Sequence, residues 1–159
     1  LVFVFDPDSR EIKWHASDPF ILQHDPDFLE NGWIGVFDNN RDFTTRGTML
    51  GGSRILAFQP HADSMEVRFP TSRSAPFYTH AGGKWQQLEN GNMLLTEARP
   101  SRVVEVTPDG RTAWEWIKAS HDGTNVATVL EGTKYSNITR DDVASWSCPS
   151  TDSSRTSAQ

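Results

Sequence analysis

Hydrophobic and polar residues alternate along much of the chain, and this period-two pattern predicts β-strands with one buried face. The clearest alternating segments are residues 54–60, 65–70, 92–97, 102–108 and 112–117. Turn-forming clusters separate these segments, among them Asn31-Gly32, Asn90-Gly91 and Pro108-Asp109-Gly110. The spacing typical of amphipathic helices is scarce, so the sequence predicts an all-β fold built from short hairpins.

The strand pattern also repeats within the chain. Leu29-Glu30-Asn31-Gly32 recurs as Leu88-Glu89-Asn90-Gly91, and the strand that begins at Ser53-Arg54 recurs from Ser101-Arg102. The first copy is longer because of an insertion around residues 41–52. Residues 2–15 resemble residues 102–116, so the second half of the repeat occurs a third time at the start of the chain.

Each repeat unit holds four expected antiparallel strands in roughly 40–50 residues, which is typical of a β-propeller blade. A β-sandwich also has many short strands, but it does not require the same hairpin twice with the same neighbours. We therefore predict a partial β-propeller over residues 1–146. Its expected parts are a blade end (1–16), two complete four-stranded blades (20–70 and 77–118) and the start of a further blade (125–137).

Propellers close with four to eight blades, so the chain alone has too few. We expect the missing blades to come from a longer chain, of which this one is a fragment, or from self-association. The Ser/Thr-rich residues 147–159 offer little to bury and are expected to be disordered.

Composition narrows the possible partners. The net charge of −6 lacks the basic surplus with which proteins neutralise nucleic-acid phosphates, so no nucleic-acid partner is expected. No apolar run approaches the length of a membrane span. The single cysteine, Cys148, excludes an internal disulfide and a cysteine metal cluster.

His24 is the leading candidate for chemistry, since it begins an expected inner strand, and inner strands line a propeller's channel. The aligned residue of the second repeat is Gly83, so the repeat does not itself require histidine here. Gln23 and Asp25 flank His24 and are expected to orient the imidazole. A structural role for a lone histidine at a strand end remains the alternative.

Further candidate ligand-binding residues lie at the same expected strand ends. Asp38, Asn39 and Asn40 end the strand that pairs with the His24 strand, although ordinary turn chemistry also explains them. His80 precedes the next inner strand. We expect neither a metal site nor a cofactor, because the candidate metal ligands are few.

Several of these segments resemble one family, the arylsulfotransferases that use aryl sulfates rather than PAPS as donor. The resemblance covers roughly residues 2–136 and rests on residues 23–40, 51–58, 77–116 and 131–136. It implies a six-bladed propeller, of which this chain is the C-terminal part, and an extracytoplasmic location, periplasmic or secreted. In this sequence Asn40 stands where many members of the family have glycine.

The resemblance also implies a reaction. A histidine that matches His24 takes a sulfuryl group from a phenolic sulfate, forming a sulfohistidine, and passes the group to a phenol. The alternative hypotheses are a non-catalytic propeller that binds a ligand or partner and, less favoured, a metal-dependent propeller hydrolase.

Overall fold

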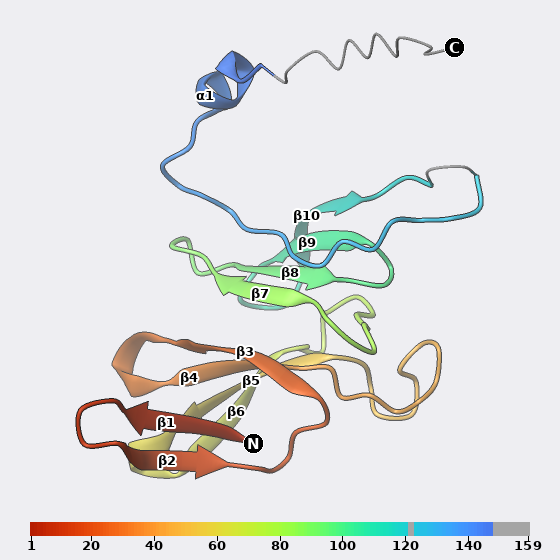
Figure 1. The fold of residues 1–159 in the computed structure, drawn as a ribbon. Helices are drawn as coiled ribbons and strands as arrows, with labels where there is room; N and C mark the ends of the chain where they lie inside the picture. Colours follow the sequence, from red (N-terminus) through yellow and green to blue (C-terminus); the bar gives the residue numbers. More distant parts are fainter. Residues whose placement is uncertain (121–122, 148–159) are drawn as a thin grey trace, which may run out of the picture.

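The computed structural model describes residues 1–120 and 123–147, and nearly all of its regular structure is β (Figure 1). The first two strands, β1 (Val2–Asp6) and β2 (Glu11–Ala16), form an antiparallel hairpin. Ten strands in antiparallel sheets confirm the all-β prediction for the described residues. Within them no closed barrel forms. Cys148 and most of the tail predicted to be disordered lie outside the described part.

Two four-stranded antiparallel sheets follow the hairpin, each with its strands in chain order. The first sheet contains β3 (Gln23–Phe28), β4 (Ile34–Asp38), β5 (Arg54–Gln59) and β6 (Ser64–Phe69). The second sheet contains β7 (Lys84–Gln87), β8 (Met93–Glu97), β9 (Arg102–Val106) and β10 (Thr112–Ile117). Short helices complete the described structure: η1 (Glu30–Gly32), η2 (Pro60–Ala62) and α1 (Arg140–Ser145).

The hairpin and the two sheets pack in layers, because side chains alternate between the faces of each central strand. In β4, Ile34 and Val36 join the cluster shared with the β1–β2 hairpin, whereas Phe37 joins the core shared with the second sheet. In β8, Leu95 faces that same core and Leu94 belongs to a cluster on the opposite face. Figure 1 shows the resulting order of hairpin, first sheet and second sheet.

Residues 125–137, the expected start of a further blade, contain no assigned strand. Hydrogen bonds hold this segment against the second sheet. Val129 N donates to Ala98 O (3.3 Å), and Gly132 N donates to Thr96 Oγ1 (2.9 Å). The segment therefore lies against the second sheet, and its assignment to a further blade stays a prediction.

Among the described residues, no helix combines the length and the apolar character that crossing a membrane requires.

Candidate functional site

The polar strand ends that the sequence singled out gather at one end of the first sheet. Antiparallel pairing places Gln23 of β3 opposite Asp38 of β4, and Asp38 opposite Arg54 of β5. Asn39 and Asn40 continue from the same end of β4. Asp38, Asn39 and Asn40 are almost completely buried, with exposed fractions of 0%, 1% and 4% respectively.

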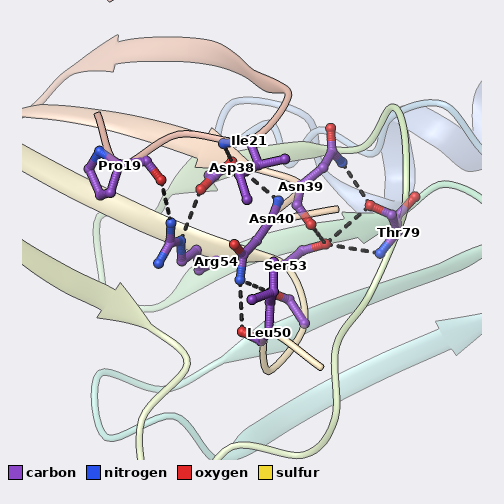
Figure 2. Close-up of polar contacts among 10 residues, drawn as sticks. Pro19, Ile21, Asp38, Asn39, Asn40, Leu50, Ser53, Arg54 and Thr79 are labelled. Carbon is purple, nitrogen blue, oxygen red and sulfur yellow. Dashed lines mark hydrogen bonds and ion pairs between the residues drawn. The ribbon is translucent and has the colours of Figure 1, made fainter. Parts of the chain in front are cut away.

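Asp38 connects three parts of the backbone near this end (Figure 2). Its Oδ1 accepts hydrogen bonds from Ile21 N (2.8 Å) and Asn40 N (3.2 Å). Its Oδ2 accepts a hydrogen bond from Arg54 Nε (2.9 Å), and Arg54 Nη2 donates to Pro19 O (2.7 Å). The carboxylate thus holds together the segment that enters β3, the end of β4 and the start of β5.

The second sheet repeats this arrangement. Glu97 at the end of β8 accepts hydrogen bonds from Tyr78 N and from Arg102 Nε, and Arg102 Nη2 donates to Pro76 O (3.0 Å). Burial raises the pKa of Glu97, while the Tyr78 N–H and the Arg102 guanidinium act in the opposite direction. Because both sheets have a carboxylate–arginine pair at the same place, Asp38 has a structural role.

Asn39 and Asn40 have their side-chain donors fully occupied by the backbone, and Figure 2 shows the contacts with Thr79 and Leu50 among these. Asn39 Nδ2 donates to Thr79 O (2.8 Å) and Gly82 O (2.9 Å). Asn40 Nδ2 donates to Leu50 O (2.8 Å) and Gly52 O (3.0 Å). An amide NH₂ group has two hydrogens, so neither side chain has an N–H left for a ligand. The two asparagines fix the neighbouring loops.

His24 differs from these residues because its imidazole is not held by hydrogen bonds to its expected orienting partners. Its ring stacks on Phe37, with ring centroids 4.9 Å apart and 19° between the planes. Nε2 is buried and has no hydrogen-bond partner within the described part of the chain. Gln23 and Asp25 make no hydrogen bond to the ring in residues 1–120 and 123–147, so stacking on Phe37 is what orients it.

Asp25 instead connects the two sheets. Its Oδ2 accepts a hydrogen bond from Trp85 N (3.1 Å), and its backbone carbonyl accepts one from Trp85 Nε1 (2.8 Å). Its Oδ1 lies 3.7 Å from Lys84 Nζ. Asp25 therefore anchors β7 against β3.

The strand register also corrects the expected counterpart of His24. His24 lies opposite Phe37, and Lys84 lies opposite Thr96. Phe37 and Thr96 each directly precede the strand-end carboxylate of their sheet. Lys84, rather than Gly83, is thus the counterpart of His24. The difference arises from an irregularity in β3 just after His24, where β3 has one residue more than β4.

His80 lies in the loop before β7, held close to the end of β4 by the bonds of Asn39 to this loop. Burial lowers the pKa of His80, and the positive charges of Arg99 and Arg41 lower it further. The imidazole is therefore mainly neutral near pH 7 and able to accept a proton.

Arg41 and Arg99 are the site residues that the sequence reasoning missed. Arg41 comes directly after the buried Asn40, shortly beyond the end of β4. Arg99 comes directly after the buried Ala98, shortly beyond the end of β8. The recurrence of arginine after both strand ends was the available sequence signal. Arg41 Nε is buried without a hydrogen-bond partner in the described residues, and the Arg41 guanidinium carbon lies 4.8 Å from the centroid of the Phe43 ring.

The inserted segment 41–52 is an ordered loop built around Asp42. Its Oδ1 accepts hydrogen bonds from Thr44 N (2.9 Å) and Thr44 Oγ1 (2.7 Å), and its Oδ2 accepts them from Met49 N (2.7 Å) and Leu50 N (3.3 Å). Burial raises the pKa of Asp42, but these hydrogen bonds outweigh it and lower the pKa to about 2. The loop holds Arg41 and Phe43 beside the end of β4.

No three His, Cys, Asp or Glu side chains in residues 1–120 and 123–147 are grouped so that they could hold a metal ion.

Comparison with protein families gives a match over most of the chain. The family model described as "Arylsulfotransferase (ASST)" matches residues 1–119, about three-quarters of the chain. Neither the curated proteins nor the solved structures compared with the chain match it.

Proposed function

Because the chain belongs to the arylsulfotransferase (ASST) family, we propose that it forms part of a β-propeller that transfers sulfuryl groups through His24. Membership implies, in general terms, an aryl sulfate as donor and a phenol as acceptor. The participation of His24 and the propeller architecture are the parts that we add to this general function.

The repeated contacts at the strand ends support the assignment of the sheets to propeller blades. Ser53 Oγ donates to Thr79 O (3.1 Å), in the segment that leads from the first sheet into β7. Ser101 Oγ, at the same place in the second sheet, donates to Ala127 O (2.5 Å). The contact of Ala127 matches that of Thr79, which supports the proposal that residues 125–137 begin a further blade.

Two outer faces of the layered structure have large exposed apolar side chains. Phe3 and Phe5 are 52% and 48% exposed on the β1–β2 hairpin, and Trp114 and Trp116 are 51% and 42% exposed on β10. Blades from a longer chain or from a second copy would cover these faces and complete the ring.

The observation that carries the proposed chemistry is the buried Nε2 of His24, which has no hydrogen-bond partner among the described residues. A buried ring nitrogen without a hydrogen bond is costly, so a structural histidine normally has a partner. A neutral imidazole nitrogen has the lone pair that a nucleophile requires. Reaction at Nε2 requires the groups that cover this atom to move, because the atom is buried in this structure.

The proposed reaction consists of two displacements. In the first, the imidazole nitrogen forms a bond to sulfur, the bond between sulfur and the aryl oxygen breaks, and the phenolate leaves and takes up a proton from the solvent. In the second, the acceptor phenol loses its proton to His80, which releases it to the solvent, and the phenol oxygen attacks sulfur. The nitrogen–sulfur bond then breaks, which restores His24 and releases the new aryl sulfate.

Kinetics of variants test this assignment, with 4-nitrophenyl sulfate as donor and phenol as acceptor. We expect His24→Ala to reduce transfer by about a thousandfold or more, as the removal of a nucleophile does. His61→Ala, in the exposed helix η2, is the matched control and should leave the rate unchanged. Equal rates for His24→Ala and the parent chain would contradict the proposal.

A further inference from the structure

Arg41 and Arg99, the two arginines near His80, differ in ion pairing from most other arginines in the described part of the chain. Arg54, Arg68, Arg73, Arg102 and Arg111 all form ion pairs with Asp or Glu. Neither Arg41 nor Arg99 has an ion-pair partner within the described part of the chain. The carboxylate nearest to Arg41 in sequence, that of Asp42, is occupied by hydrogen bonds from its own loop.

Hydrogen bonds bring the backbones of these two arginines to the same loop. The side chain of Asn39, two residues before Arg41, donates to Thr79 O (2.8 Å). The backbone N–H of Arg99 donates to Thr79 Oγ1 (3.5 Å). The backbones of both arginines therefore lie close to Thr79 and His80. Burial lowers the pKa of His80, and the positive charges of Arg99 and Arg41 lower it further.

An aromatic side chain accompanies the charges. Phe43 is 82% exposed on the ordered 41–52 loop, and the Arg41 guanidinium carbon lies 4.8 Å from its ring centroid. Cation–π contact with the ring helps to hold the Arg41 guanidinium in place.

We propose that Arg41 and Arg99 bind the anionic group of an aryl ligand and that the aromatic ring of this ligand packs against Phe43. The Nε of Arg41 has no partner in the described residues and is buried in this structure, so it can donate to the anion once the groups that cover it move. The second repeat has no counterpart of the 41–52 insertion, so only the first repeat contributes a loop with Phe43 to this site. This inference deepens the proposed function, because it names the residues that recognise the anionic aryl substrate.

Calorimetric titration of the complete chain with 4-nitrophenyl sulfate tests the site, with inorganic sulfate and 4-nitrophenol as separate ligands. The aryl sulfate should bind more tightly than either. Arg41→Gln and Arg99→Gln should each raise the Kd about tenfold, the effect of losing one charge-assisted hydrogen bond. Phe43→Ala should weaken binding of the aryl sulfate more than binding of inorganic sulfate, because only the aryl ligand loses a ring contact while both lose the support that Phe43 gives to Arg41.

Arg46→Gln is the matched control, since Arg46 is exposed on the same loop and also lacks an ion pair among the described residues. It should change the Kd by less than about twofold. If Arg46→Gln weakens binding as much as Arg41→Gln does, or if Arg41→Gln and Arg99→Gln bind like the parent chain, the inference is wrong. An absence of any binding by the parent chain would also overturn it.

The His24→Ala variant separates this inference from the proposed function. We expect it to bind 4-nitrophenyl sulfate normally and to lack transfer. Loss of transfer in His24→Ala together with normal binding in Arg41→Gln would overturn only the anion site. Equal thermal unfolding midpoints of the compared variants would show that each is folded.

Discussion

At the scale of single residues, the described polar side chains at the strand ends differ in whether their hydrogen-bonding capacity is used. Asp38 and the side-chain N–H groups of Asn39 and Asn40 have partners, so burying them costs little free energy. His24 Nε2 and Arg41 Nε are buried without partners. Unpaired buried groups reduce stability, and a bound anionic ligand would relieve that cost at Arg41.

Asp42 allows a prediction of how the 41–52 loop responds to pH. Its folded-state pKa of about 2 lies below the ordinary value of 3.8. The ionised carboxylate therefore stabilises the loop fully above about pH 4, and this contribution is lost as the pH falls through about 2. In an NMR titration, the amide resonances of Met49 and Leu50 should shift with a midpoint near pH 2. Asp42→Asn should abolish this transition, whereas a midpoint near the ordinary value of 3.8 would contradict the hydrogen-bonded loop.

The sequence allowed the position of the candidate site to be predicted better than the roles of its residues. Alternation and turn residues place His24 and the end of β4 at the same end of a hairpin, and pairing of Gln23 with Asp38 agrees. The sequence does not show which donors the backbone occupies. Asn39 bonds to Thr79 and Gly82, which are distant in sequence, so its structural role depends on tertiary contacts.

At the scale of the strands, contact between the two sheets depends on Gly35 in β4. A Cβ atom at this position would lie 2.1 Å from Trp85 Cη2, and Trp85 is only 3% exposed. A buried indole ring has little freedom to move, because its surroundings are closely packed. Glycine at this position lets β7 approach β4.

We therefore predict that Gly35→Ala lowers the free energy of unfolding by about 1–3 kcal/mol, the usual cost of overpacking a core. Trp85→Phe removes the ring atoms that would clash, and also the indole hydrogen bond to Asp25 O. In urea unfolding, the double variant should lose less stability than the sum of the two single losses. Additive losses would mean that Gly35 and Trp85 do not determine the approach of the sheets.

The irregularity in β3 shows why element positions were easier to predict than their register. The repeat alignment matched Gly83 to His24 as its counterpart, whereas the strand register makes Lys84 that counterpart. Asp25 has a φ of 54° and bonds to Trp85 of the other sheet. Such irregularities depend on contacts between sheets, and a repeat aligned without gaps cannot reveal them.

At the scale of the whole molecule, the layers follow from alternation, because each central strand has one face for each neighbouring layer. The same alternation leaves apolar side chains on the outer faces of the layers. The sequence pattern does not show what covers these faces. The number of blades therefore could not be predicted from these residues. The repeated carboxylate–arginine pairs support blades, and the proposed ring needs further strands from other residues or from another copy.

The central claim is that His24 accepts a sulfuryl group, and peptide mass spectrometry tests it most directly. The folded chain is exposed briefly to excess 4-nitrophenyl sulfate without a phenol acceptor and quenched at alkaline pH, which preserves an N-sulfated histidine. The account predicts a mass increase equal to one SO₃ group on the peptide that contains His24, and no such increase in His24→Ala. A folded chain that binds the aryl sulfate but has no adduct on His24 would contradict the account and favour a non-catalytic binding propeller.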